Sequence, residues 1–339
     1  MPKCCVIEGD GIGHEVIPAA LAVLLKVIPD MEVVTAEAGW DCFQRRGVSV
    51  PDETLATLRE CRAGLFGAVS SPSYKVAGYR SAIITMRQAL ELYANIRPVR
   101  SMPGLSPRPG IDLVVVRENT EGLYAGRERL EGETAIAERV ISRAASRRIG
   151  LRALELARST GRKGQLTIVH KANVLPVTDG LFRSSIYEVI SESGADRDGL
   201  KVDELLVDTA AYQMVSAPEN FDVIVTTNLF GDILSDEAAY WCGGMGMAPS
   251  LNWGDGTAIA EPVHGSAPDI AGKGIANPLA AILSAALLAR YAWGLEAAAG
   301  RIEAAVKISL AQDIPLEGNC IGKNNTTTSI TQAVLAHLN

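Results

Sequence analysis

Short apolar runs alternate along the chain with longer stretches of helical spacing, a pattern that is typical of an α/β protein. The predicted buried strands lie at residues 4–7, 113–116, 166–169 and 223–225. The predicted helices lie at residues 14–27, 82–92, 136–157 and 278–290. The pattern therefore predicts an α/β fold with no repeat and no long linker.

Two stretches rich in small residues indicate where the chain passes between domains. Residues 101–110 are rich in Pro, Gly and Ser, and residues 243–246 are rich in Gly. The chain is expected to leave one domain near residue 100 and to re-enter it near residue 245. The prediction is a larger domain of residues 1–99 plus 245–339 and a smaller domain of residues 100–244.

Composition narrows the partners and the compartment. The net charge of −7 and the pI of about 5.3 disfavour nucleic acid as the main partner, because phosphate binding needs a basic surface. The longest apolar run, near residues 279–289, is too short to span a bilayer, and the N-terminus shows no secretory signal. The 6 cysteines have no metal-ligand spacing, which suits a reducing compartment. We therefore expect a cytoplasmic protein without a membrane partner.

Two segments rich in small residues are candidates for close approach to a ligand. Gly9-x-Gly11-x-Gly13 follows the first predicted strand, but it differs by one position from the G-x-G-x-x-G dinucleotide pattern. An ordinary tight turn between strand and helix explains it equally well. Residues 261–272 form a second such segment, in which we expect His264 to contact an adenine and Asp269 a ribose diol.

Three arginines lie near the ends of predicted elements: Arg87, Arg97 and Arg117. Arg117 ends an apolar strand, and the carboxyl ends of buried parallel strands are where α/β proteins bind ligands. A guanidinium can hold a carboxylate through two hydrogen bonds. For any one of these arginines a surface salt bridge is the better explanation. Together they suggest an anionic substrate with more than one carboxylate.

Carboxylates form the next candidate group. Asp232 and Asp236 are spaced i, i+4 and therefore share one face of a helix, while Asp208 ends another apolar run. Like charges on one helix face repel each other unless a cation lies between them, and hard oxygen ligands suit Mg²⁺ or Mn²⁺. The alternative is an exposed helix with two solvated acids.

Two further residues are candidates for proton transfer. Lys171 follows an apolar strand, where desolvation can make a lysine act as a base, although a surface charge is the commoner explanation. Tyr124 is a candidate acid, although a core tyrosine is commoner.

Together these segments resemble the β-decarboxylating dehydrogenases, the family of isocitrate, isopropylmalate and homoisocitrate dehydrogenases, with homoisocitrate dehydrogenase closest. The resemblance runs from Val6 to about Leu310. Its motifs are the turn at 8–13, Leu92-Tyr-Ala-Asn-Ile-Arg-Pro, Val116-Arg-Glu-Asn-Thr-Glu-Gly-Leu-Tyr, His170-Lys-Ala-Asn, Asn228-Leu-Phe-Gly-Asp-Ile-Leu-Ser-Asp and the loop at 261–272. It implies a dimer, or a tetramer, of two-domain α/β subunits with an NAD site unlike the Rossmann type. The larger domain would bind the cofactor, and the smaller one would hold the metal ligands and the dimer interface.

The resemblance also implies roles for the candidate residues. The substrate carboxylates would be bound by Arg87, Arg97 and Arg117. Mg²⁺ or Mn²⁺ would be held by Asp232, Asp236 and the partner subunit's Asp208. The partner's Lys171 would take the hydroxyl proton while a hydride passes to the nicotinamide, and Tyr124 would help to protonate C3 after CO₂ has left.

The resemblance implies NAD rather than NADP as cofactor. NADP-dependent members are similar to one another in carrying Lys-Tyr where this chain has Asp269-Ile270. A carboxylate accepts hydrogen bonds from an unmodified ribose and repels a 2′-phosphate. The rest of the cofactor site would consist of Ser70, His264, Gly265, Ser266, Ala267 and Asn277.

Substrate identity depends on the segment at residues 70–86. Tyr79-x-Ser81-x-Ile83 resembles homoisocitrate dehydrogenase, and Lys75 and Arg80 add positive charge that suits a distal anion on the substrate. The expected reaction is therefore the conversion of homoisocitrate to 2-oxoadipate. Isocitrate, isopropylmalate and a phosphonate-bearing analogue of the 3-phosphonomethylmalate type are the alternatives.

Two observations qualify the resemblance. Residues 314–322 replace the Thr-Pro-Asp-Leu-Gly-Gly stretch of the family, so we expect the cofactor side to be reshaped there. A different class of function, a non-catalytic regulatory subunit of a heteromeric isocitrate dehydrogenase, is disfavoured because the catalytic and metal-binding residue types are all present.

Overall fold

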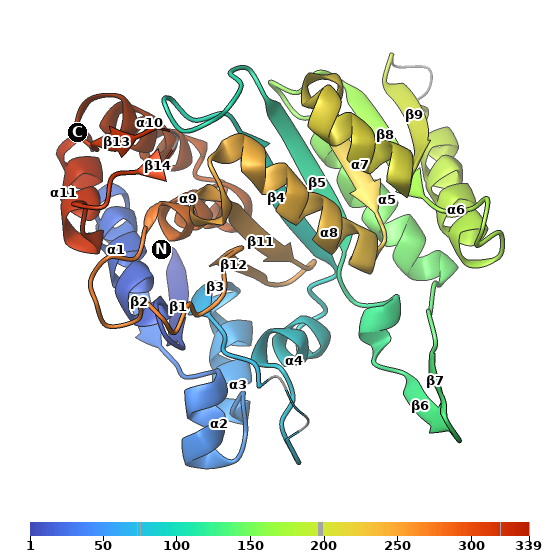
Figure 1. The fold of residues 1–339 in the computed structure, drawn as a ribbon, viewed down its shortest axis with the longest axis horizontal. Helices are drawn as coiled ribbons and strands as arrows, with labels where there is room; N and C mark the ends of the chain where they lie inside the picture. The colour runs from blue at the N-terminus through green and yellow to red at the C-terminus, as the bar shows by residue number, and fades with distance from the viewer. Residues whose placement is uncertain (73, 75, 196–198, 319, 339) are drawn as a thin grey trace. The chain divides into compact units, whose positions relative to one another are not determined.

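The computed structural model describes residues 1–72, 74, 76–195, 199–318 and 320–338, and Lys75 therefore lies outside the described residues. The chain forms two compact units (Figure 1). The first unit consists of Met1–Leu92, Ser101–Pro109 and Ala239–Asn339, and the second of Tyr93–Arg100 and Gly110–Ala238. The predicted crossings were near residues 100 and 245. Strand β4 (Ala94–Arg100) instead belongs to the second unit, where it pairs with β5 (Asp112–Glu118) along its whole length.

The first unit is built on a largely parallel sheet. Its strands lie in the order β2 (Glu32–Thr35), β1 (Lys3–Gly9), β3 (Ala63–Ala68), β12 (Ala258–Pro262) and β11 (Pro249–Trp253). Strand β11 is antiparallel to β12, and the other pairs are parallel. The predicted strand at residues 4–7 is confirmed as the buried centre of β1.

Helices cover both faces of this sheet. On one face α1 (Gly13–Val27) and α9 (Leu279–Trp293) pack on the strands and on each other. The remaining helices of the unit are α2 (Trp40–Arg46), α3 (Asp52–Cys61), α4 (Ala82–Ala89), α10 (Glu296–Gln312) and α11 (Thr327–Ala336). On the other face the alternating side chains of β1 and β3, among them Ile7 and Phe66, form one cluster with Leu58 and Met86. Burial of each such large apolar side chain stabilises the fold by roughly 1.5–3 kcal/mol.

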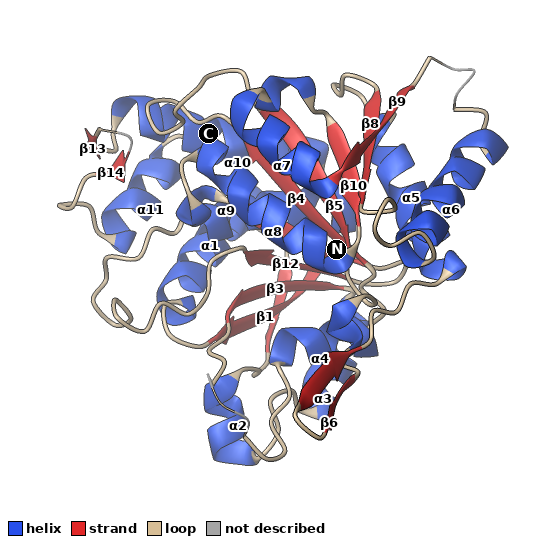
Figure 2. Cartoon of the chain, turned by 45° about the vertical axis from the view of Figure 1, so that its right-hand side comes forward, coloured by secondary structure: helices blue, strands red, loops and turns tan. Residues whose placement is uncertain are grey.

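The second unit is built on strands in the order β4, β5, β10 (Val223–Thr226), β8 (Gln165–His170) and β9 (Lys201–Leu206). Strands β4 and β5 are antiparallel, and the others are parallel to β5. Figures 1 and 2 show α5 (Arg143–Ala157) and α6 (Thr178–Glu192) on one face, and α7 (Val207–Ser216) and α8 (Asn228–Ala238) on the other. The predicted strands at residues 113–116, 166–169 and 223–225 are confirmed within β5, β8 and β10.

Two predicted helices have the wrong bounds. The helix predicted at 136–157 begins only at Arg143, because the preceding residues form an antiparallel hairpin of β6 (Glu128–Glu131) and β7 (Thr134–Ala137). Ser142 is the N-cap residue of this helix, because its side chain accepts a hydrogen bond from the amide of Ala145. The helix predicted at 82–92 ends at Ala89, because Glu91 takes a left-handed backbone conformation with φ +50° before β4.

Short elements complete the chain. The 3₁₀ helices lie at Leu123–Ala125, Pro218–Asn220, Ala239–Cys242 and Met245–Met247. Within the unusual segment at 314–322, the structure contains a small antiparallel pair, β13 (Leu316–Glu317) and β14 (Cys320–Ile321). Among the described residues, no helix combines the length and apolar character needed to cross a membrane.

Candidate active site

Helix α8 carries two of the predicted metal ligands. Asp232 and Asp236 lie one turn apart on this helix, as their spacing predicted. The helix packs against β5. A Cβ atom at Gly231 would lie 2.7 Å from both Cβ and Cγ of Arg117, so only a glycine permits this approach. Gly231 therefore sets the distance between the carboxylates of α8 and the arginine of β5.

Arg117 projects from β5 toward α8. It is 1% exposed, and its guanidinium forms an ion pair with Asp232. Its Nε and Nη2 donate hydrogen bonds to Oδ1 of Asn228 at 3.1 and 2.8 Å. Asn228 in turn donates from Nδ2 to the carbonyl of Glu121 at 3.1 Å, which fixes the amide orientation. The guanidinium is thus held in one position by a charge and an amide.

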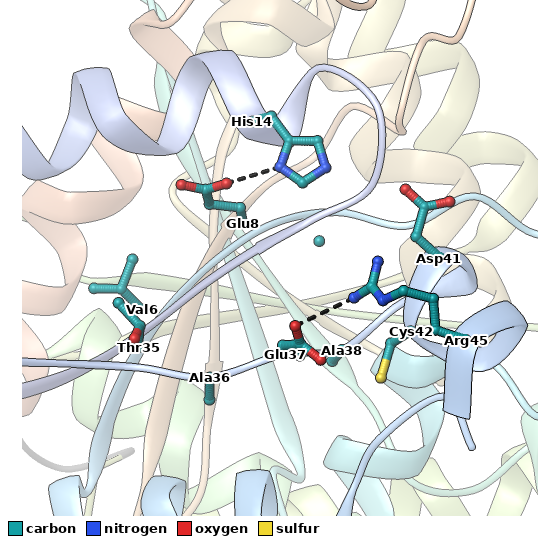
Figure 3. A pocket seen from close by; sticks show the side chains of 11 residues that line it. Val6, Glu8, His14, Thr35, Ala36, Glu37, Ala38, Asp41, Cys42 and Arg45 are labelled. Atoms are coloured by element: carbon teal, nitrogen blue, oxygen red, sulfur yellow. Dashed lines mark hydrogen bonds and ion pairs between the residues drawn. The ribbon is translucent and has the colours of Figure 1, made fainter. Parts of the chain in front are cut away.

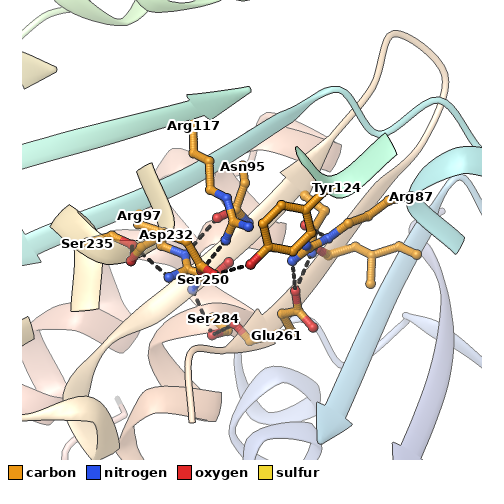
Figure 4. Close-up of polar contacts among 12 residues, drawn as sticks. Arg87, Asn95, Arg97, Arg117, Tyr124, Asp232, Ser235, Ser250, Glu261 and Ser284 are labelled. Carbon is orange, nitrogen blue, oxygen red and sulfur yellow. Dashed lines mark hydrogen bonds and ion pairs between the residues drawn. The ribbon is translucent and has the colours of Figure 1, made fainter. Parts of the chain in front are cut away.

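Arg97 lies on the same face of the strand pair. Asn95 is opposite Arg117 in the antiparallel register of β4 and β5, and Arg97 is two residues further along β4. The Nη1 atom of Arg97 lies 3.0 Å from Oδ1 of Asp236. Its Nη2 atom lies 3.4 Å from Oδ1 of Asp232, and Figure 4 shows Arg97 beside Asp232. Its Nε donates to Oδ1 of Asn95 at 2.7 Å, and Nη1 also donates to Ser235 at 2.7 Å. Two buried cations therefore face two carboxylates.

The environment of these groups alters their proton affinity. Burial raises the pKa of Asp236 above its usual value, and the neighbouring Arg97 opposes this shift. The hydroxyl of Tyr124 donates to Asp232. Burial raises the pKa of Tyr124, and the negative charge of Asp232 raises it further. Tyr124 therefore carries its proton at neutral pH, which is the state that an acid requires.

Lys171 and Asp208 form a separate ion pair in the second unit. Lys171 follows β8, and Asp208 lies in the first turn of α7. The hydrogen bond from Lys171 lowers the pKa of the Asp208 carboxyl group. The Asp208 side chain is 63% exposed, so this pair lies at the surface of the unit. The structure thus brings together the two residues that the resemblance assigned to the neighbouring subunit.

Among the residues that the structure describes, the donor set for a divalent cation is incomplete. Among the described residues, no group of three or more His, Cys, Asp or Glu side chains is placed to hold a metal ion. Asp232 and Asp236 supply hard carboxylate oxygens from one helix face, which suit Mg²⁺ or Mn²⁺. The donor chemistry of these two carboxylates therefore fits such an ion, which would need further ligands in addition to them.

Arg87 belongs to the first unit and is bound there by polar partners. It is 7% exposed, and its Nε donates to Oδ1 of Asn252 at 2.9 Å. Its Nη2 lies 3.1 Å from Oε1 of Glu261. Glu261 lies in β12, directly before the candidate cofactor loop. These two partners of Arg87 lie 165 and 174 residues away in the sequence, and no local pattern indicates them.

The candidate cofactor loop follows β12. Burial lowers the pKa of His264, so its imidazole is neutral at neutral pH. The Nε2 atom of His264 is buried and makes no hydrogen bond to any described residue. Buried polar atoms are normally satisfied, so this nitrogen suits a hydrogen bond from a ligand such as an adenine. Asp269 is exposed, as a ribose-binding carboxylate must be, and Ile270 is partly buried.

Other predicted cofactor residues have structural contacts. The hydroxyls of Ser70 and Ser266 are 2.7 Å apart. Asn277 accepts a hydrogen bond from the amide of Leu279 at 3.0 Å, and thus helps to begin α9. Ala267 has φ +40°, which shows that the loop turns sharply at this residue, and Gly265 is exposed.

The predicted distal-anion residues receive little direct support. Arg80 is exposed, and its Nη2 donates to Oε1 of Gln88 at 3.2 Å, so the side chain lies along α4. Ser81 is the N-cap residue of α4, without a capping bond from its side chain. Ile84, which the sequence analysis did not single out, is partly buried one turn before Arg87.

A pocket of about 340 Å³ lies in the first unit beside the ends of β1 and β2 (Figure 3). Gly9 of the glycine cluster lines it, whereas none of the candidate catalytic, metal-binding or substrate-binding residues does. Two pairs of its charged side chains interact with each other, Glu8 with His14 at 2.7 Å and Glu37 with Arg45 at 3.2 Å. We assign no function to this pocket.

Comparison with known proteins identifies the family. Residues 3–334 match the family described as isocitrate/isopropylmalate dehydrogenase, and the chain belongs to this family of decarboxylating dehydrogenases. It is 54% identical over 340 residues to an isocitrate/homoisocitrate dehydrogenase of Thermus thermophilus, covering 99% of this chain and 98% of that protein. It is 47% identical to a 3-isopropylmalate/3-methylmalate dehydrogenase of Methanocaldococcus jannaschii, covering 98% of each. The crystal structure of isocitrate dehydrogenase from Methylococcus capsulatus is similar with a TM-score of 0.93 at 40% identity, covering 100% of this chain and 99% of that one. The fold expected from the resemblance is thereby confirmed.

Replacement of Gly231 by alanine should displace Arg117, because the new methyl group would lie 2.7 Å from two of its side-chain carbons. We expect kcat/KM for the hydroxy acid to fall at least about tenfold, which corresponds to about 1.4 kcal/mol, with little change in the KM for the cofactor. Gly180 is a matched control, because it is a helical glycine with open space around its Cβ position. Gly180→Ala should leave kcat/KM unchanged. Equal effects of the two substitutions would contradict this view of Gly231.

Proposed function

We propose that the chain catalyses the NAD-dependent, divalent-metal-dependent oxidative decarboxylation of a 2-hydroxy acid that carries a carboxylate on C3. The observation that carries the proposal is the arrangement around Asp232, where two buried arginines and a protonated tyrosine converge on one carboxylate. Arg97 and Arg117 supply donors for a polyanion, Asp232 supplies a carboxylate ligand for a cation, and Tyr124 supplies a proton donor beside both.

The residues divide the reaction into binding and proton transfer. Arg97 and Arg117 would hold carboxylates of the substrate through paired N–H donors. NAD, when bound, would supply the acceptor for the hydride of C2, and the partner's Lys171 would accept the proton of the C2 hydroxyl. Mg²⁺ or Mn²⁺, held by Asp232, Asp236 and the partner's Asp208, would supply Lewis-acid stabilisation of the negative charge on the C2 oxygen.

Loss of CO₂ from C3 leaves a carbon that must be protonated. Tyr124 would donate that proton, and the shifted pKa of its hydroxyl keeps the proton available. The base gains one proton and the acid loses one, so the overall reaction consumes no proton. The residue types that a regulatory subunit would lack, Tyr124 and Lys171 above all, are present, so the regulatory alternative has no support.

The exposed surface around Lys171 and Asp208 supports a dimer with shared sites. Asp208 lies on α7 on the same helical face as Tyr212 and Val215, which are 73% and 57% exposed. Val177, shortly after Lys171, is 81% exposed. Exposed apolar surface around charged residues is typical of an interface with another chain. A second copy of this chain would cover it and would add Lys171 and Asp208 to the opposite site.

Two substrate classes have separate support. A substrate with a distal carboxylate, such as homoisocitrate or isocitrate, agrees with the name of the Thermus thermophilus relative, an isocitrate/homoisocitrate dehydrogenase, and with the basic side chain of Arg80 ahead of α4. A substrate with an apolar group on C3, such as isopropylmalate, agrees with the name of the Methanocaldococcus jannaschii relative. It also agrees with the partly buried Ile84, one turn before Arg87. Homoisocitrate remains our leading candidate because the Thermus relative is the more similar of the two.

The purified protein should form NADH and CO₂ in equal amounts from the correct hydroxy acid when Mg²⁺ or Mn²⁺ is present. Chelation should abolish the reaction, and added Mn²⁺ should restore it. Asp232→Asn should lower kcat at least about a hundredfold, because it removes a carboxylate ligand, which amounts to about 2.7 kcal/mol. Asp30→Asn, at an exposed acid between α1 and β2, should have no effect. Turnover that survives chelation would contradict the proposed metal requirement.

NAD should be preferred to NADP by at least about tenfold in kcat/KM, or about 1.4 kcal/mol, because Asp269 repels a 2′-phosphate. Steady-state kinetics with both cofactors measure this ratio. The double replacement Asp269→Lys with Ile270→Tyr should narrow or reverse it. Equal use of both cofactors by the native protein would show that Asp269 does not select the cofactor.

Shared sites can be tested by mixing two inactive proteins. Lys171→Ala and Asp232→Asn subunits should regain activity when they exchange, because one site of the mixed dimer then carries neither substitution. Native mass spectrometry should confirm the exchange. If exchange occurs and activity stays absent, the two residues do not act in one site from different chains.

The substrate is decided by comparing kcat/KM for homoisocitrate, isocitrate and isopropylmalate in the native protein and in two variants. If a distal anion is bound, Arg80→Ala should lower activity on the first two at least about tenfold more than on isopropylmalate, as expected for loss of a charge-assisted bond. If the apolar alternative is correct, isopropylmalate is the best native substrate, and Ile84→Ala lowers its kcat/KM most.

A further inference from the structure

The turn between β1 and α1 binds several distant segments through one carboxylate. Asp10 is 1% exposed, and its oxygens accept hydrogen bonds from three backbone amides. Oδ2 accepts from Trp40 and Ser70, each at 2.8 Å, and Oδ1 accepts from Asp41 at 2.9 Å. Trp40 and Asp41 open α2, and Ser70 begins the loop between β3 and α4. Asp10 thus fixes the start of the loop that leads to Ser81 and Arg87.

The same turn also holds the candidate cofactor loop. The amide of Ile12 donates to the carbonyl of Ser266 at 2.9 Å. Gly11 has φ +56°, and a Cβ there would lie 2.2 Å from this carbonyl, so only glycine allows the contact. The amide of Asp10 donates to Ala68 at 2.9 Å, and that of Gly13 donates to Asp10 at 3.0 Å. Because these amides are bound within the protein, the glycine cluster acts as a structural clamp and not as a phosphate cradle.

One direct contact joins the two loops that the turn holds. The hydroxyls of Ser70 and Ser266 are 2.7 Å apart. Ser70 is held further by Tyr79, whose hydroxyl donates to its carbonyl at 3.1 Å. The ring of Tyr79 packs edge-on against Trp40 and Phe43 of α2, with centroids 5.1 and 5.2 Å away. These contacts therefore restrain the backbone at Ser70 relative to the backbone at Ser266.

We propose that Asp10 is a positioning residue and that the Ser70–Ser266 hydroxyl contact couples the segment between β3 and α4, which leads to the candidate substrate residues Ser81 and Arg87, to the cofactor loop at 261–272. Displacement of either loop changes the position of the other, so loss of the contact affects the binding of both ligands. The assignment of one loop to substrate and the other to cofactor rests on the function proposed above. The mechanical coupling of the two loops does not.

The coupling is tested first without activity, by hydrogen–deuterium exchange in the native protein, Ser70→Ala and Ser266→Ala. Ser70→Ala should speed exchange in residues 264–272, and Ser266→Ala should speed exchange in residues 69–72, each by about three- to tenfold, as expected for loss of one hydrogen bond. Ser309→Ala is the matched control, because that buried hydroxyl donates to Ala305 within α10 at 2.8 Å, away from both loops. It should change exchange in neither segment.

The functional consequence is a pattern of KM values. Each single serine variant should raise the KM for both the hydroxy acid and NAD by about three- to tenfold with a smaller change in kcat, and the double variant should be no worse than either single one. Asp10→Asn should raise both KM values further, since three amides lose their charged acceptor.

The experiments test the coupling of the two loops and the proposed function separately. The two loops are not coupled if each serine substitution affects exchange only in its own loop. They are also not coupled if the effects of the two substitutions on KM add in the double variant. If the native protein turns over no hydroxy acid with NAD, the proposed function fails, whereas the exchange experiment still decides the coupling. If Asp10→Asn does not fold, the serine variants carry the test alone.

Discussion

Two buried guanidinium groups facing two carboxylates are the constraint on which the candidate site depends. Charges removed from water are tolerated only when they are paired and hydrogen bonded, because removal of one partner leaves the buried charge uncompensated. Arg117 and Arg97 meet this condition through Asp232 and Asp236, with amide oxygens as additional acceptors. The close packing of α8 on β5 at Gly231 follows from the same requirement, because a wider gap would separate the charges.

This pairing suggests how the site would accept its ligands without leaving a charge uncompensated. The aspartates are the counter-ions of the arginines in the structure described here. In the proposed reaction, a substrate carboxylate would replace the aspartates as the partner of the arginines. A divalent cation would then bind to the aspartates. The substrate alone would leave the aspartates without counter-ions, and the cation alone would leave the buried guanidinium groups without theirs. Both states are unfavourable because unpaired charges are costly to keep out of water. Substrate and cation should therefore bind cooperatively, with a coupling that is equal in both directions.

The features that the sequence predicted are those with a local signal. The all-apolar centre of β5 and the i, i+4 spacing of Asp232 and Asp236 depend only on neighbouring residues, and the structure confirms both. Asp10 had no such signal, since its partners lie 30, 31 and 60 residues away and an aspartate in a glycine turn is unremarkable by itself. The start of α5 was missed because apolar residues at 136–157 have helical spacing, whereas the Ser142 cap and the β6–β7 pairing decide the boundary. Side-chain partners on different elements, such as Asn228 of α8 for Arg117 of β5, depend on a tertiary arrangement that the sequence does not contain.

Cooperative binding of cation and substrate tests the central claim most directly. Mn²⁺ would be titrated into the purified protein by calorimetry, in the absence of NAD, with and without a saturating 2-hydroxy acid that carries a C3 carboxylate. We predict that the acid raises the affinity for Mn²⁺ at least about tenfold, or about 1.4 kcal/mol, and that Asp232→Asn removes the effect. The same Mn²⁺ affinity with and without the acid in the native protein would contradict it.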